Sequence, residues 1–457
     1  TIDTMYAQPT KRVTDGQLEF QVRWRKAYPL LQIVDRGRSV HVVGQGASSL
    51  YEGRASMRLV GVGNGAPEDY AGKDVKGAMV VARSSDAVAP WDRAKNAADA
   101  GAALLVVVSP AGRMLAEYVG TPEGTDSAIP VVSVGATDGA ALLASAASGR
   151  SVKVEGVPDS PYVYDLVKAW NQRVPSTLAY RPRTSDFATV TMRLHGAAPA
   201  PGGEFRWDYR PYRPSGFGLP LRQSTGVTRT DYVAGSPGTT WAEAVVGGPR
   251  FAWSQSSEVH PLVAGRRTTQ DWLAPVVHPS NGGGFWSSTR YSGFLALNVQ
   301  PWADGGAGHA GYIQRDDSAP SPGDDAIRLK VWQDGTLVRD VTGFASTYLQ
   351  DLPDGPLRLK LDLVATRDAK VWTFSPRTHT VWTVRSPGIS KGLDSVDLMP
   401  VLQVGYDVRT DLAGYARGGK QSVRFSVTHL ADVYGAGKVR GASLAVCRSA
   451  NFSTGSD

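Results

Sequence analysis

The stretch from Gly72 to Gly149 most constrains how this chain folds, because short apolar runs alternate there with segments of helical period. Ala94, Ala97, Ala98 and Gly101–Ala102 share one face of a helix, with charged residues mostly on the other. The pattern predicts a compact β-α-β-β-α unit. Its elements are strands at Met79–Ala82, Leu104–Val108 and Ile129–Val134 and helices at Ala94–Ala102 and Gly139–Ala147.

The rest of the chain is rich in strand and turn residues. Its 51 glycines, 29 prolines, 12 tryptophans and 17 tyrosines favour short strands joined by turns. Leu18, Phe20, Val22 and Trp24 alternate with polar residues, which predicts a half-buried strand, and Asp334-Gly335 predicts a tight hairpin. We expect one short helix at Tyr164–Gln172.

A chain of 457 residues is long enough for several domains, each with its own core. The predicted fold class is mainly β with an α/β insert. The expected boundaries are a β segment at 1–56 that packs with a later sandwich, the α/β unit at 57–157, a connector at 158–203, and β-sandwiches at 204–315 and 316–457.

Within the α/β unit, three short motifs carry a resemblance to a known family. They are G-x-x-V-x-G at Gly72–Gly77, A-x-x-A-G-A at Ala97–Ala102 and I-P-V-V-S-V at Ile129–Val134. Together with the order of elements, they resemble the protease-associated (PA) domain. PA domains accompany peptidases and contribute no nucleophile, so the resemblance implies proteolysis by another part of the protein.

Further stretches in collinear order extend the resemblance from about Thr4 to Val446. "YVYDLVKAWNQRVPSTLAYRP", "VWQDGTLVRD" and "RTHTVWTVRS" are similar to the region that follows the catalytic domain in large secreted subtilisin-like serine peptidases of actinobacteria. The chain departs from that family at its end, where Cys447–Phe452 replaces an acidic turn and a tryptophan. The last sandwich is therefore expected to be incomplete or divergent.

No catalytic residue is predicted in this chain. The D-[ST]-G, H-G-T-H and G-T-S-M-A-x-P sequences that a subtilisin-like triad requires do not occur, nor does the G-x-S-x-G elbow. Ser215 lacks the glycine two positions before it, and Ser443 lacks the one two positions after it. The expected partners are a subtilisin-like catalytic domain or chain and a protein or peptide substrate.

No cofactor or metal site is predicted. The single Cys447 excludes an internal disulfide and any multi-cysteine metal site, and no H-E-x-x-H or H-x-H pair occurs. His379 fits a surface or interstrand role. Asp316, Asp317, Asp324 and Asp325 could offer oxygen ligands to calcium, but their spacing matches no known calcium loop, so a solvated loop is the preferred interpretation.

Charge and composition leave one competing function open. The formal net charge of +7 is spread along the chain, which favours a basic solvated surface over nucleic-acid binding, and no apolar run is long enough for a membrane span. We expect a secreted, extracellular protein. The alternative to a peptidase accessory region is a free-standing adhesion or glycan-binding protein, with Trp286, Tyr291, Trp302, Trp332 and Trp372 as candidates for sugar stacking.

Overall fold

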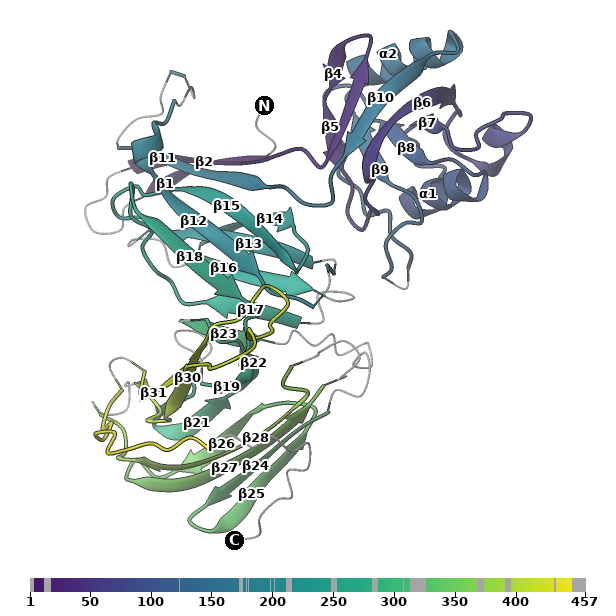
Figure 1. Ribbon diagram of the computed structural model, residues 1–457. Helices are drawn as coiled ribbons and strands as arrows, with labels where there is room; N and C mark the ends of the chain where they lie inside the picture. Colours follow the sequence, from purple (N-terminus) through teal and green to yellow (C-terminus); the bar gives the residue numbers. More distant parts are fainter. Residues whose placement is uncertain are drawn as a thin grey trace. The chain divides into compact units, whose positions relative to one another are not determined.

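A computed structural model gives the fold of this chain (Figure 1). The residues that the structure describes are 4–11, 18–122, 124–171, 176–177, 179, 181–197, 199–200, 202–210, 216–247, 253–281, 287–306, 308–312, 326–367, 374–390, 396–430 and 433–445. They form two compact units, the first mainly Thr1–Ala274 and the second mainly Pro275–Tyr312 and Gly323–Asp411.

The first unit contains an α/β module, residues 31–156, built on an eight-stranded sheet of order β4-β3-β10-β6-β7-β8-β9-β5. Strands β6 to β9 pair in parallel, and the strands on either side of them pair antiparallel. The elements are β3 (Leu31–Asp35), β4 (Arg38–Val40), β5 (Val42–Gly44), β6 (Gly53–Gly61), the 3-10 helix η1 (Pro67–Tyr70), β7 (Met79–Arg83), α1 (Pro90–Asp99), β8 (Leu104–Val108), β9 (Val131–Val134), α2 (Ala136–Ala147) and β10 (Ser151–Gly156).

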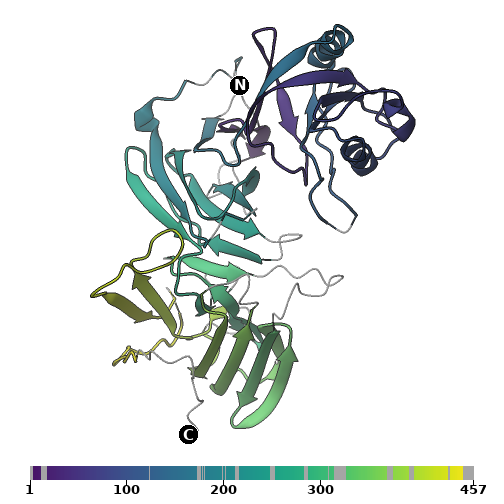
Figure 2. The ribbon, with the colours of Figure 1, turned by 45° about the vertical axis from the view of Figure 1, so that its right-hand side comes forward.

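The two helices cover opposite faces of this sheet (Figures 1 and 2). Leu142 of α2 joins a core with Met79, Val81 and Val106, whereas Ala97 of α1 joins a second core on the other face. Because parallel strands covered on both faces bury every side chain, β8 is a continuous apolar run rather than an alternating one. The predicted β-α-β-β-α order is confirmed.

The first unit also contains a β-sandwich of two facing sheets, which we call the first sandwich. Val167 and Val190 of one sheet share a core with Trp241 and Val245 of the other. One sheet has the order β1-β2-β11-β15-β12-β18, and β14, β13, β16 and β17 are consecutive neighbours in the other. The elements are β1 (Thr4–Lys11), β2 (Leu18–Ala27), β11 (Tyr162–Asn171), the 3-10 helix η2 (Thr184–Asp186), β12 (Phe187–Leu194), β13 (Gly202–Tyr209), β14 (Phe217–Arg222), β15 (Val227–Ala234), β16 (Thr240–Gly247), β17 (Trp253–Ser257) and β18 (Arg267–Trp272).

Two local expectations differ from the structure. Residues 164–171 continue a strand instead of forming a helix, because β11 is paired on both sides, with β2 and with β15. Residues 31–56, which the sequence placed with the later sandwich, supply β3, β4 and β5 and the start of β6 to the sheet of the α/β module. The module is thus inserted between β2 and β11, which are neighbouring strands of the first sandwich.

The second unit is all β in the residues that the structure describes. One of its two four-stranded sheets, order β25-β24-β27-β28, includes the predicted hairpin, with Asp334 and Gly335 both at positive φ (49° and 88°) as such a tight turn requires. The strands are β19 (His278–Ser280), β20 (Thr289–Tyr291), β21 (Gly293–Asn298), β22 (Gln300–Ala303), β23 (His309–Tyr312), β24 (Ala326–Gln333), β25 (Thr336–Thr342), β26 (Ser346–Leu352), β27 (Leu357–Thr366), β28 (Arg377–Ser386), β29 (Asp397–Leu398), β30 (Gln403–Val408) and β31 (Val423–Thr428).

Candidate functional site

Three loops of the α/β module follow the carboxyl ends of its parallel strands and lie along one edge of the sheet. Residues 62–66 follow β6, residues 84–89 follow β7 and residues 109–119 follow β8. We call these three segments the loop edge. In open α/β sheets, ligands bind outside the carboxyl ends of the strands, so the loop edge is the candidate binding site of this module.

Arg93 of α1 holds the loop edge together from inside. Its side chain is only 1% exposed. The guanidinium donates hydrogen bonds to the carbonyl oxygens of Ser85 and Val88, both at 2.9 Å, and to that of Asn64 at 3.2 Å. It also meets the carboxylate of Glu117 at 3.2 Å. Because a buried charge is tolerated only when it is paired, this one side chain fixes all three loops in a single arrangement.

The loop after β6 is shaped to admit Arg93. Gly65 has a φ of +81°, and a Cβ there would lie 2.6 Å from Arg93 Cγ. The Asp69 carboxylate accepts hydrogen bonds from the backbone N–H groups of Asn64 (2.8 Å) and Ala66 (3.1 Å). Burial, together with the nearby Asp69 carboxylate, raises the pKa of Tyr70 to about 12, so its hydroxyl stays neutral.

The long loop after β8 is pinned by buried polar side chains. Gln45 accepts a hydrogen bond from the Glu117 N–H at 2.7 Å and donates one to the Leu115 carbonyl at 3.2 Å. The Ser133 hydroxyl donates to the same carbonyl at 2.6 Å, and Ser109 accepts from the Leu115 N–H at 3.1 Å. The loop is therefore ordered before any ligand arrives, which lowers the entropic cost of binding.

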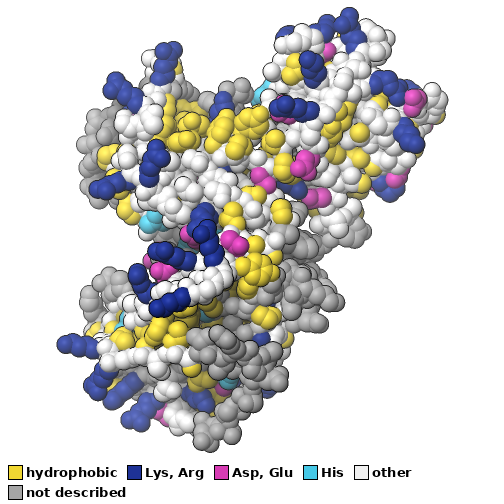
Figure 3. Space-filling model, in the orientation of Figure 1, with side chains coloured by type: hydrophobic (Ala, Val, Ile, Leu, Met, Phe, Trp, Pro, Cys, Tyr) yellow, Lys and Arg dark blue, Asp and Glu magenta, His cyan; other side chains and the backbone are white. Residues whose placement is uncertain are grey.

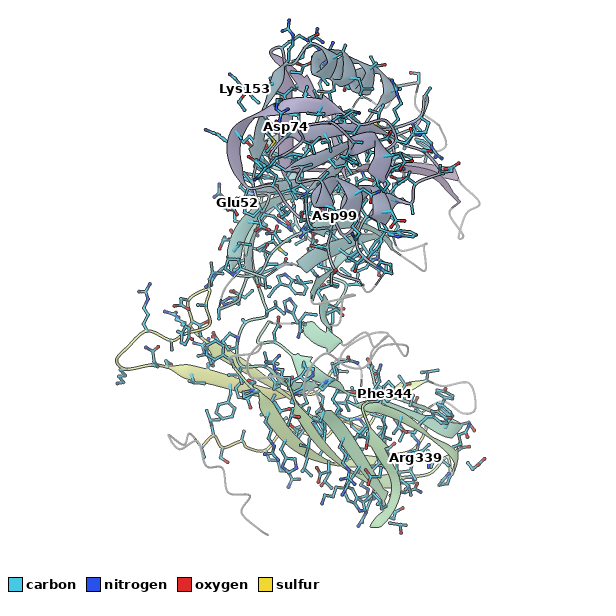
Figure 4. The ribbon with its side chains drawn as sticks, turned by 90° about the vertical axis from the view of Figure 1, so that its right-hand side faces the viewer. Glu52, Asp74, Asp99, Lys153, Arg339 and Phe344 are labelled. Carbon is cyan, nitrogen blue, oxygen red and sulfur yellow. The ribbon has the colours of Figure 1, made fainter. Side chains whose placement is uncertain are left out.

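Two aromatic side chains next to this framework are open to solvent. Trp91, two residues before Arg93, is 43% exposed, and Tyr118, which follows Glu117, is 52% exposed. The charged side chains labelled on this module in Figure 4, Glu52, Asp74, Asp99 and Lys153, lie outside the three loops. Large rings on a rigid frame provide contact area for another molecule, so the loop edge is suited to binding.

Three histidine–carboxylate pairs occur among the described residues, and none of them lies in the three loops. They are His195–Asp271 (2.7 Å), His309–Asp304 (2.8 Å) and His379–Asp362 (3.0 Å). The second ring nitrogen of His195 is buried without a hydrogen-bond partner. A triad needs the imidazole to bridge a carboxylate and a nucleophile, which His195 does not do.

The structure describes some of the residues that the sequence analysis singled out and not others. Ser443 lies in exposed coil. The exposed side chain of His379 pairs with Asp362 on the neighbouring strand, and this is the interstrand role that the sequence indicated. Ser215, Cys447 and the calcium candidates Asp316, Asp317, Asp324 and Asp325 lie outside the described residues. In the part of the chain that the structure describes, no three metal-ligating side chains converge.

The aromatic candidates for sugar stacking are also divided. Trp302 is buried, at 5% exposure, beneath the guanidinium of Arg367, and Tyr291 stacks on Phe294 at 4.8 Å. Trp332 is half-buried under the ammonium of Lys360, which lies 4.9 Å from the ring centroid. Trp286 and Trp372 lie outside the described residues. Of the two candidate tryptophans that the structure describes, Trp302 and Trp332, only Trp332 has part of its surface exposed.

A group of nine ionisable side chains, all among the described residues, lies between the sheets of the first sandwich and was not predicted from the sequence. Arg206 Nη1 meets Asp165 and its Nη2 meets Asp231, both at 2.6 Å, and its Nε meets Glu243 at 2.7 Å. Each member is at most 3% exposed, so the cluster is closed to substrates. Its members are Arg23, Arg25, Asp165, Glu204, Arg206, Asp208, Arg229, Asp231 and Glu243.

Comparison with known families identifies one part of the chain. The PA domain family matches residues 55–142, which cover β6 to most of α2 and include the whole loop edge. A search of curated proteins found no match. No helix among the described residues is long and apolar enough to cross a lipid bilayer.

Two of the solved structures with partial similarity to this chain are aminopeptidases. An aminopeptidase from Aneurinibacillus sp. strain AM-1 shares 18% identity over 37% of this chain and 37% of its own, with a TM-score of 0.25. The zinc aminopeptidase BSAP from Bacillus subtilis shares 20% identity over 32% and 35%, with a TM-score of 0.24. This chain thus covers little more than a third of either protein, and at these TM-scores neither adds to the assignment of the PA domain.

Proposed function

We propose that this chain, whose residues 55–142 form a PA domain, is a non-catalytic accessory region of a secreted subtilisin-like serine peptidase and that its loop edge binds protein substrate. The observation that supports this most is a preorganised loop edge with exposed Trp91 and Tyr118. The accessory region would hold substrate near a catalytic part elsewhere. The subtilisin-like type rests on the sequence resemblance.

Binding without turnover is the expected behaviour. We predict that the intact chain binds fluorescent casein fragments and that Trp91→Ala with Tyr118→Ala weakens this binding by about tenfold or more, because each ring supplies a large share of such a contact. Fluorescence anisotropy measures the affinity. Tyr415→Ala, a change at a ring that is also 52% exposed but lies in the second unit, is the matched control.

Two results would contradict the proposal. One is unchanged affinity in the Trp91/Tyr118 variant, which would remove the loop edge from substrate binding. The other is cleavage of casein by the chain alone, or stoichiometric labelling of one serine by a fluorophosphonate probe, which would make the chain itself a peptidase.

A further inference from the structure

The sheet β25-β24-β27-β28 of the second unit has one buried side and one side open to solvent. On the buried side, Leu357, Leu359, Leu361 and Leu363 of β27 are at most 2% exposed. The opposite side chains of β24, β27 and β28 face solvent, and we call this side the basic sheet face. Its cationic residues are Arg328, Lys330, Arg358, Lys360, Arg377 and Arg385. Lys and Arg side chains line the lower left of this unit in the space-filling view (Figure 3).

Part of this charge is neutralised within the sheet. Arg328 forms a bidentate ion pair with Asp340 of β25, in which Nε lies 2.8 Å from Oδ1 and Nη2 lies 2.7 Å from Oδ2. His379 meets Asp362 at 3.0 Å. These two pairs account for the only carboxylates that the described residues of β24, β25, β27 and β28 place on this side. The cations at the other end of the sheet are left without such partners.

At that end, like charges stand opposite each other. Arg358 of β27 pairs in register with Arg385 of β28, and Lys360 follows Arg358 on the same side. No ion pair joins Arg358, Lys360 or Arg385 to any carboxylate in the described chain. Like charges directly opposite on neighbouring strands are destabilising, so this arrangement does not contribute to the stability of the sheet. An external anion would relieve the repulsion.

We propose that the basic sheet face binds a linear acidic polysaccharide. Backbone positions on adjacent strands lie about 5 Å apart, and positions two residues apart along a strand about 7 Å, so the cationic side chains are distributed to meet anionic groups spread along an extended chain. The exposed hydroxyls of Thr342 and Thr383 flank the cations, and Trp332, whose ring lies under the Lys360 ammonium, can offer its remaining exposed surface to a sugar ring.

The small number of aromatic rings on the face favours a polysaccharide over a single-stranded nucleic acid as the ligand. Proteins that bind single strands stack successive bases on successive rings. On the described part of this face, the aromatic rings are Trp332 and the imidazole of His379, and the latter is engaged by Asp362. A sugar polymer needs one stacking ring and several charged or hydroxyl contacts.

The test measures binding of the intact chain to fluorescent heparin at low salt. We expect Arg358→Gln with Arg385→Gln to weaken binding by about fivefold or more, because two charge-assisted contacts are lost. Added salt should weaken binding of the unmodified chain, since the contacts are exposed. Arg417→Gln with Lys420→Gln removes the same charge from exposed positions of the same unit and should change affinity little.

Stability provides an independent readout. If the cations serve a ligand, Arg385→Thr removes the repulsion opposite Arg358 and places a good strand former there, so its unfolding midpoint should stay the same or rise while heparin affinity falls. A fall in both the unfolding midpoint and the heparin affinity would assign Arg385 a structural role and overturn the proposal.

Other probes decide between classes of ligand. Polygalacturonate should compete with heparin, and neutral dextran should not. Equal loss of heparin binding in the Arg417/Lys420 control would show attraction to net charge alone and would contradict a specific face. Tighter binding of oligo(dT) than of heparin would make the ligand a nucleic acid and would also contradict the proposal. None of these outcomes depends on the loop edge or on peptidase association.

Discussion

At the scale of single residues, the buried carboxylate of Asp165 links the two sheets of the first sandwich. It lies on β11, is fully buried, and contacts Arg23 in its own sheet at 2.8 Å and Arg206 of the facing sheet at 2.6 Å. Burial disfavours the charged carboxylate, but the guanidinium groups of Arg25, Arg23 and Arg206 outweigh it and hold the pKa of Asp165 well below its usual range. The carboxylate therefore stays ionised inside the protein.

Replacing this carboxylate should destabilise the first sandwich and reduce its pH dependence. Asp165→Asn should lower the free energy of unfolding by about 3–5 kcal/mol, because it leaves buried guanidinium groups uncompensated. Since the folded pKa lies below the unfolded value of about 3.9, the stabilisation by Asp165 is complete above that value and is lost as pH falls through the folded pKa. Urea unfolding between about pH 7 and about pH 3 measures both effects.

The exposed ion pair of Asp340 provides a control for this prediction. Asp340→Asn removes a carboxylate that pairs with Arg328 in solvent, and little change in stability is expected. An Asp165→Asn variant as stable as the unmodified chain at neutral pH would contradict the role assigned to the buried cluster.

At the scale of elements, α1 packs on its sheet through small residues. Ala94 and Ala97 of α1 are at most 2% exposed, and with Ala102, which follows the helix, they share a core with Val80 and Leu105. Ala98, which the sequence placed on the same face, is only half-buried. Short side chains let the helix approach the sheet closely, so Ala97 has the least room for a larger side chain.

A larger residue at Ala97 should therefore loosen the α/β module. Ala97→Leu should cost about 1–3 kcal/mol of stability through overpacking, while helix propensity is almost unchanged. Hydrogen exchange should show faster exchange in β7 and β8 and unchanged exchange in β24 and β27 of the second unit. Ala98→Leu is the matched control and should have a smaller effect. Equal loss of protection in both units would mean that the whole chain unfolds as one core.

At the scale of the whole molecule, the α/β module is inserted in the sequence between two strands that pair directly in one sheet of the first sandwich. The chain leaves the first sandwich after Ala27 of β2 and returns at β11, where Val163 pairs in register with Ala27. The two ends of the insertion are therefore neighbours on adjacent strands, so the sheet is continuous across it. A module inserted in this way can fold from its own cores.

Removal of the module should leave a folded first sandwich. We expect a chain with Tyr28–Tyr162 replaced by Asn-Gly to unfold cooperatively, because a two-residue turn fits residues that pair directly. The fluorescence of buried Trp241 and Trp272 reports the state of the sandwich core. A second variant with a longer Gly-Ser loop separates turn strain from loss of the module. Failure of both to fold would show that the module and the sandwich form one cooperative structure.

The sequence alone determined the order of elements in the α/β module and the Asp334-Gly335 hairpin, because helix period, apolar runs and turn residues are local signals. Burial in the first sandwich was decided by tertiary structure. Arg23 alternates with Val22 and Trp24, a pattern that predicts a strand with one solvent-exposed face. All three side chains are nevertheless buried, because Arg23 forms ion pairs with carboxylates on β11 and β13. The opposition of Arg358 and Arg385 likewise depends on strand register, which long-range pairing sets and local patterns do not contain.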